Sequence, residues 1–251
     1  MVSVDINCDL RESFGAYRIG MDREVMPYIT SANIACGFHG GDPLVMEETV
    51  RLCREAGVHA GAHPGLPDLQ GFGRRVMAVS PGEARAFVKY QVGALQAFCA
   101  GAGIPLSHVK LHGALYNMAA RDYALARAIC EGIREIDGGL KLLALSGSQM
   151  IQAAGDTGLP WASEVFADRA YQSDGSLVPR NQPGAVLEDE EQAVRQVVQM
   201  VREKTVTATD GTRVPIQADS VCVHGDGPKA LAFVQNIRKR LEEEGISVSA
   251  F

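Results

Sequence analysis

Short segments in which apolar and polar residues alternate recur along the whole chain. There are seven of them, at residues 2–8, 31–38, 57–63, 107–113, 141–147, 161–168 and 219–225. Alternation with a period of two, together with enrichment in β-forming residues, is typical of β-strands. The sequence therefore predicts seven strands.

Longer amphipathic stretches with helical periodicity separate these strands. They cover residues 43–56, 81–100, 121–136, 147–155, 187–204 and 227–244. Pro43, Pro81 and Pro228 stand in the first turn of three of these stretches, where proline favours the start of a helix. We therefore predict that strands and helices alternate.

Strict alternation implies a parallel sheet with right-handed crossovers. No linker or shift in composition interrupts it, so we expect one α/β domain over residues 1–251. No G-x-G-x-x-G motif opens the first helix, which favours a closed or incompletely closed seven-stranded parallel (β/α) barrel over an open sheet. Residues 205–217, with Asp210-Gly211 between β-forming residues, predict a small hairpin at the periphery.

The composition excludes several classes of protein. Hydrophobic residues make up 46% of the chain and charged residues 22%, which is ordinary for a globular protein. A net charge of −6 and the absence of a basic stripe argue against a nucleic-acid partner. No apolar run reaches the roughly 18 residues of a membrane span, and no secretory signal is visible, so we expect a cytoplasmic protein without a membrane partner. The six cysteines form no C-x-x-C pair and are expected to be buried free thiols.

Histidines and other polar residues concentrate at one end of the predicted barrel. His39, His63, His112 and His224 stand at the carboxyl ends of predicted strands, where barrel enzymes carry their active sites. Because side chains alternate between the two faces of a strand, the polar residues of the first, fourth and last strands should all point into the barrel. These polar residues are Asp5, Asn7, Asp9, His108, Lys110, His112, Ser220, Cys222 and His224. They indicate either a catalytic cavity or a self-satisfied network of buried polar groups.

Lys110 gives the clearest test of that interior. A lysine that points into a barrel must pair with a carboxylate such as Asp9 or have a lowered pKa. Either state suits acid–base or electrophilic chemistry.

The loops that follow these strands carry further candidates. Glycines flank His39 within residues 33–42, and glycine lets a backbone approach a ligand closely. Arg74 and Arg75 suit a carboxylate, so a small anionic substrate fits, with a solvated ion pair as the alternative. No P-loop motif occurs, so the sequence gives no case for phosphate binding by this chain alone.

Six long motifs together resemble the LamB/YcsF family. They are INCDLRESFG, SANIACGFHGGDP, GAHPGLPDLQGFGRR, VKLHGALYN, EVFADRAYQSDGSLVPR and VCVHGDGP, and the resemblance runs in order from about residue 4 to residue 245. It implies a distorted barrel of the glycoside hydrolase/deacetylase type. It also implies ATP-dependent opening of 5-oxoproline to glutamate, with 5-oxoprolinase subunits B and C as partners. The chain departs from the family pattern with Arg11 at a position that is commonly glycine and Leu111 where proline is common.

The chemistry of a lactam assigns roles to the candidates. Asp9 is expected to act as general base, Lys110 and His112 to stabilise developing oxyanion charge, and His63 to serve as a second acid–base group. We expect the substrate to be bound by Asn7, Glu12, Asn33, His39, Asp42, Arg75, Asp168, Arg169, Arg180 and His224. ATP would be a co-substrate that is handled together with the partner subunits.

Two alternatives stay open. Asp9, His39 and His63 could hold a divalent metal ion, which would make the protein a metal-dependent deacetylase or amidohydrolase on a small amide or carbohydrate. The chain could also be a non-catalytic subunit that only binds the lactam. The oligomeric state is open too, with a homo-oligomer among the options.

Overall fold

Seven parallel strands close into a barrel. The computed structural model describes residues 2–10, 13–15, 22–224 and 230–251. The strands are β1 (Ser3–Leu10), β2 (Ser31–Ala35), β3 (His59–His63), β4 (Leu106–Val109), β5 (Lys141–Leu145), β6 (Trp161–Phe166) and β9 (Ser220–His224). They follow one another in that order, and β9 pairs in parallel with both β6 and β1. The predicted seven-stranded parallel barrel is therefore confirmed, and it is fully closed.

Three further short strands lie outside the barrel proper. β7 (Thr205–Thr207) and β8 (Arg213–Pro215) pair antiparallel and form the predicted hairpin. The third, β10 (Ser247–Val248), pairs in parallel with the first residues of β1. The sequence did not predict β10, because two residues are too short to show a period.

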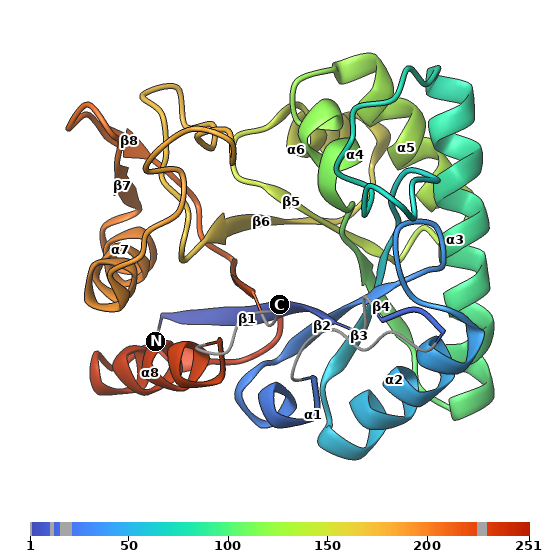
Figure 1. Ribbon diagram of the computed structural model, residues 1–251, viewed down its shortest axis with the longest axis horizontal. Coiled ribbons are helices and arrows are strands. Elements are labelled where there is room, and N and C mark those ends of the chain that lie inside the picture. Colours follow the sequence, from blue (N-terminus) through green and yellow to red (C-terminus); the bar gives the residue numbers. More distant parts are fainter. Residues whose placement is uncertain (1, 11–12, 16–21, 225–229) are drawn as a thin grey trace.

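Helices surround the barrel (Figure 1). Those that match predictions are α2 (Pro43–Ala56), α3 (Pro81–Ala102), α5 (Tyr123–Ile136), α6 (Gln149–Thr157), α7 (Glu190–Glu203) and α8 (Ala230–Glu243). The structure adds α1 (Asp22–Val25), the 3-10 turn η1 (Met26–Tyr28) and α4 (Gly113–Ala119), all too short for a clear amphipathic pattern. In Figure 1, α7 and the hairpin lie on the side of the barrel opposite α3. The predicted helix start at Pro228 lies outside the described residues.

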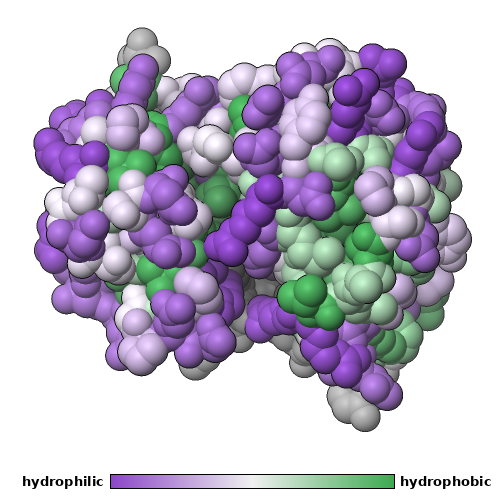
Figure 2. Space-filling model, turned by 90° about the horizontal axis from the view of Figure 1, so that it is seen from above, coloured by the Kyte–Doolittle hydropathy of each residue, from purple (hydrophilic) through white to green (hydrophobic). Residues whose placement is uncertain are grey.

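The hydrophobic core lies between the strands and the helices. On β1, Val4, Ile6, Cys8 and Leu10 are at most 1% exposed, so the apolar face of the strand points outward under the helices. All six cysteines are free and buried, as predicted. Figure 2 shows a hollow in one face of the molecule, with hydrophilic side chains along it and a hydrophobic area on the side of α3. None of the helices within the described residues is long and apolar enough to cross a membrane.

Candidate functional site

The interior of the barrel is polar. Near the amino-terminal ends of the strands, the polar side chains around Asp5 hydrogen-bond one another. The Asp5 carboxylate accepts hydrogen bonds from the hydroxyls of Thr30, Ser31 and Ser220. Burial raises the pKa of Asp5, and those hydroxyls oppose the rise. One step along β1, Asn7 donates to Ser220 Oγ at 2.7 Å and accepts from Asn33 Nδ2 at 2.7 Å. At this end of the barrel the polar side chains therefore form the hydrogen-bonded network that the second interpretation expected, and the catalytic cavity stays a prediction for the other end.

Lys110 is the central cation of the reactive end. Its side chain is 3% exposed, and Nζ lies 2.8 Å from Asp9 Oδ1 and 2.7 Å from Glu164 Oε1. Asn7 Oδ1 at 3.1 Å and Cys222 Sγ at 3.2 Å complete its surroundings. Burial works against the charge, but the two carboxylates prevail and hold the pKa of Lys110 well above its usual value. An ammonium group has three protons, and Lys110 donates them to Asp9 Oδ1, Asn7 Oδ1 and Cys222 Sγ, while Glu164 Oε1 contributes its charge without accepting a hydrogen bond.

Asp9 has one anchored oxygen and one directed at a histidine. Oδ1 accepts from Lys110 and, at 2.9 Å, from Asn33 Nδ2. Oδ2 lies 3.5 Å from His63 Nε2. The Asp9 side chain is 16% exposed, whereas that of His63 is 1% exposed. The anchoring of Oδ1 therefore orients Oδ2 toward His63.

His63 and His112 form a buried pair whose tautomers are set by the backbone. His63 Nδ1 lies 2.8 Å from the carbonyl oxygen of Lys110, and His112 Nε2 lies 2.8 Å from that of Phe72. A carbonyl oxygen can only accept, so these two nitrogens carry the N–H. The inner nitrogens, His63 Nε2 and His112 Nδ1, lie 3.0 Å apart.

His39 packs flat against this pair. Its ring is stacked on His112 with centroids 3.6 Å apart and planes 1° apart. Burial and the neighbouring His63 hold the pKa of His39 well below its usual value, so the ring is neutral. Gly73, at φ 63°, brings the covering loop onto the rings, because a Cβ there would lie 2.7 Å from His39 Cβ.

Glu164 is a site residue that the sequence analysis missed. It is 0% exposed, pairs with Lys110, and accepts a hydrogen bond from the Tyr116 hydroxyl at 2.8 Å. It stands in the middle of β6 among apolar neighbours. A carboxylate at an interior position of a buried strand is the signal that would have identified it.

The structure brings together seven of the predicted residues, six in one network and His39 stacked on it, and gives others a structural place. Asn7, Asp9, His63, Lys110 and His112 share one connected network, which Asn33 joins through its bonds to Asn7, Asp9 and His108. Of His224, only the backbone is described, and it pairs with Asp9 at the end of β9. Glu12 and Arg11 lie outside the described residues.

Two residues that were predicted to bind the substrate hydrogen-bond the protein backbone in the structure. Asp42 caps α2 by accepting from the amides of Leu44 and Val45. Arg169 is buried and donates to the backbone carbonyls of Ala185 and Val178.

Arg75 forms a salt bridge with Asp68, as the ion-pair alternative for this segment proposed. Asp168 is partly buried directly after β6, and Arg180 is exposed farther along the same loop.

Nitrogen ligands for a metal ion are available in this cluster. His39, His63 and His112 each offer a ring nitrogen, and these atoms lie within 4.8 Å of one another.

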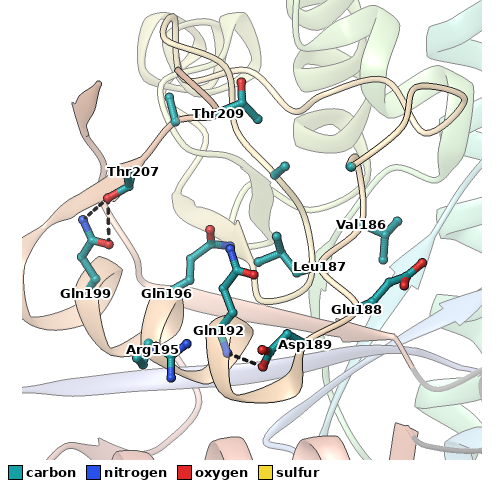
Figure 3. A pocket seen from close by; sticks show the side chains of 13 residues that line it. Val186, Leu187, Glu188, Asp189, Gln192, Arg195, Gln196, Gln199, Thr207 and Thr209 are labelled. Atoms are coloured by element: carbon teal, nitrogen blue, oxygen red, sulfur yellow. Dashed lines mark hydrogen bonds between the residues drawn. The ribbon is translucent and has the colours of Figure 1, made fainter. Parts of the chain in front are cut away.

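A separate pocket of about 830 Å³ lies beside α7 (Figure 3). It is lined by residues 184 and 186–189, by the glutamines at one side of α7, and by residues 207–209. Gln199 bonds Thr207 across it, and Asp189 accepts from the amide of Gln192. Among the predicted site residues that the structure describes, none lines this pocket.

Comparisons with known proteins agree with the sequence motifs. The model of the LamB/YcsF family matches residues 4–251. A protein of Clostridium beijerinckii, named as the A subunit of 5-oxoprolinase, is 60% identical over 248 residues, which is 99% of this chain and 97% of the relative. A Bacillus subtilis protein of the same name is 56% identical over 250 residues, covering 100% of this chain and 97% of the relative.

Solved structures show the same fold. The lactam utilization protein from Thermus thermophilus superposes with a TM-score of 0.94 at 48% identity, and the match covers 99% of this chain and 100% of that one. A putative cellobiose-phosphate cleavage protein from Enterococcus faecalis reaches a TM-score of 0.57 at 13% identity, with 99% and 97% covered. The second likeness concerns the fold alone.

Proposed function

The chain belongs to the LamB/YcsF family, and we propose that it is the A subunit of an ATP-dependent 5-oxoprolinase that opens 5-oxo-L-proline to L-glutamate. The curated relatives at 60% and 56% identity bear the name of that subunit. One observation of this structure carries the hydrolytic role. Asp9 Oδ2 and the His63–His112 pair meet at the carboxyl end of a closed barrel, where enzymes of this architecture react.

The reaction needs an activated water and a protonated leaving group. The oxygen of water attacks the ring carbonyl carbon, the C–N bond breaks, and the ring nitrogen takes a proton as it leaves. Asp9 accepts the proton of the attacking water through Oδ2, the oxygen that Lys110 and Asn33 leave exposed to the cluster. His63 Nε2 takes that proton from Asp9 Oδ2, and the His63–His112 pair passes it to the ring nitrogen as the C–N bond breaks.

The contacts of Lys110 revise the role that the sequence suggested. All three ammonium protons are engaged by protein acceptors, so none is directed at a substrate oxyanion. Lys110 is then a positioning residue, which holds Asp9 ionised and fixes the orientation of its carboxylate. His112 also loses the oxyanion role, because its Nε2–H donates to the carbonyl of Phe72 and its Nδ1 faces His63.

ATP supplies the driving force in this proposal. An amide carbon is a poor electrophile, and transfer of the γ-phosphoryl group to the lactam oxygen, with ADP leaving, makes it attackable. Once water has added and the C–N bond has broken, the phosphoryl group remains on the new carboxyl group. A second water releases it as inorganic phosphate, which leaves glutamate. The sequence contains no P-loop, so subunits B and C would hold the nucleotide next to this barrel. The six free cysteines favour a reducing compartment such as the cytoplasm.

Reconstitution tests the proposal. The pure chain, its B and C partners, ATP and 5-oxoproline are combined, each omitted in turn, and glutamate and ADP are measured. We expect glutamate only in the complete mixture and no ATP hydrolysis by the isolated chain. Lactam-stimulated ATPase activity of the isolated chain would refute the division of labour. A complete mixture without glutamate, beside deacetylation of a small amide by the chain alone, would favour the metal-dependent alternative.

A further inference from the structure

His108 is a buried histidine that belongs neither to the proposed base nor to the proposed relay. It stands on β4, where its backbone pairs with Gly61 of β3 and Lys141 of β5, and it is 0% exposed. Burial and the charge of Lys110 lower the pKa of His108 to about 3, so the ring is neutral. A neutral imidazole has one N–H and one lone pair, and its effect on its neighbours depends on which nitrogen carries the proton.

The surrounding hydrogen bonds assign that proton. The ammonium group of Lys110 can only donate, so the side-chain atom of Asn7 that faces it at 3.1 Å is the oxygen. This oxygen and the carboxylate of Asp9 can only accept, so the Asn33 atom that lies 2.7 Å from the first and 2.9 Å from the second is its NH2 nitrogen. Asn33 Oδ1 then faces His108 Nε2 at 2.7 Å, and this ring nitrogen carries the N–H.

The Asn33 amide is thereby held in one of its two orientations. Turned over, it would place its oxygen against the acceptor oxygens of Asn7 and Asp9, and its NH2 group against the N–H of His108. We propose that His108 is a positioning residue of the active site, which fixes the Asn33 amide and through it the Asp9 carboxylate. The inference rests on the proposed function, because Asp9 acts there as the general base.

The consequence for catalysis follows from the two oxygens of Asp9. Asn33 Nδ2 and Lys110 Nζ both donate to Oδ1, while Oδ2 is directed at His63. Without the hydrogen bond from His108, Asn33 Oδ1 would be a buried acceptor without a donor. Rotation of the amide would relieve that cost, but Asp9 would then lose one of its anchors. A misplacement of roughly 1 Å at a reacting group can cost roughly 10²-fold in rate.

Further observations indicate that His108 does more than fill space. Its Nδ1 is buried and has no hydrogen-bond partner among the described residues, a cost that an apolar side chain of similar size would avoid. Gly61 leaves the room that the ring occupies, because a Cβ there would lie 2.0 Å from His108 Nε2. Asn33 is also 0% exposed, and the ring of Phe251 packs on His108 with centroids 5.4 Å apart. The fold therefore keeps a hydrogen-bond donor at this position despite its energetic cost.

Kinetics of the complete complex test the role. His108→Phe keeps a ring without the donor, and His108→Gln restores an N–H at the position of Nε2. We expect kcat to fall by roughly 10–100-fold in His108→Phe with KM almost unchanged, and His108→Gln to recover most of that loss. Ile133→Ala is the control for stability, because Ile133 is buried on α5, and the variant should lower Tm without lowering kcat.

NMR of the full chain alone gives a second measurement that needs no turnover. In the wild type, the ¹⁵N shifts of His108 should show the proton on Nε2, and the side-chain amide protons of Asn33 should exchange slowly with water. The slow exchange should be lost in folded His108→Phe and kept in His108→Gln.

Circular dichroism checks the folding of each variant, and His108→Leu replaces His108→Phe if that variant fails to fold. The positioning role would be overturned by a folded variant without the donor whose kcat stays within a few-fold of the wild type, by a His108→Gln complex no more active than His108→Phe, or by a proton on Nδ1 in the wild type. A wild-type complex that forms no glutamate, although the NMR results are as expected, would contradict the proposed function alone. Equal glutamate formation by the wild type and His108→Phe would contradict the positioning role alone.

Discussion

Replacing Lys110 by methionine removes a buried charge while nearly preserving side-chain length. Lys110 Nζ lies 2.8 Å from one carboxylate and 2.7 Å from another. At an effective dielectric constant of about 20, each contact corresponds to roughly 6 kcal/mol of direct attraction, much of which is offset by desolvation. Breaking a buried pair costs about 3–5 kcal/mol, because the partner is left charged and buried. Here two partners are left, and Glu164 is 0% exposed, so we expect the upper part of that range.

Urea and thermal unfolding measure this loss. For a chain of this length, about 4 kcal/mol corresponds to a fall in Tm of roughly 10 °C. Lys89→Met is the matched control, because Lys89 also lies 2.7 Å from a glutamate, Glu135, but its side chain is 44% exposed. That variant should lose at most about 1 kcal/mol.

A double variant identifies the cause of the loss. Lys110→Met with Glu164→Gln removes the stranded carboxylate, so it should be more stable than Lys110→Met alone. A Lys110→Met protein as stable as the wild type, or a double variant no more stable than the single one, would refute the ion-pair reasoning. Turnover of the complete complex should fall in Lys110→Met even at temperatures where the variant stays folded, because Asp9 loses its anchor.

Three further predictions concern local structure. Gly61→Ala should destabilise the protein by about 1–3 kcal/mol in urea unfolding, since the added Cβ would lie 2.0 Å from His108 Nε2. Gly93→Ala is the control and should not destabilise it, because no atom lies within 4 Å of a Cβ added there. Asp42→Ala should cost about 1 kcal/mol through loss of the α2 cap, and Asp42→Asn should retain most of that stability in the same assay. Arg75 lowers the pKa of Asp68 to about 2, so the stabilisation is complete above the unfolded value near 3.8 and is lost as the pH falls toward 2. Acid unfolding of Asp68→Asn should lack that component, and an unchanged acid profile would contradict the pairing.

The barrel and much of the cluster could be predicted because strand alternation is a strong signal. Asp5, Asn7 and Asp9 all point inward as their spacing requires, and their partners confirm it. Lys110 and His112 come after β4 ends at Val109, yet both enter the cluster because the backbone continues to pair: the amide of Lys110 bonds the carbonyl of Ala62.

Other features depend on contacts between distant segments, which one sequence does not reveal. Arg169 and Arg75 have the charge of anion ligands, but backbone carbonyls and Asp68 engage them. Glu164 carried a local signal, a carboxylate inside a buried strand, but its pairing with the distant Lys110 shows only in the structure. The stacking of His39 on His112 likewise results from the loop around Gly73, and it decides which histidines can act together.

Glutamate formation by an Asp9→Asn variant in the complete complex tests the central claim most directly. Asparagine keeps the size of the side chain but removes the charge and the basic oxygen that faces His63. His59→Gln, at the exposed start of β3, is the control and should retain wild-type turnover. We expect 5-oxoproline turnover by Asp9→Asn to fall by roughly 10²-fold or more, the low end of a general base's contribution, with partner binding intact. Turnover within a few-fold of the wild type would contradict the assignment of the active site to this cluster.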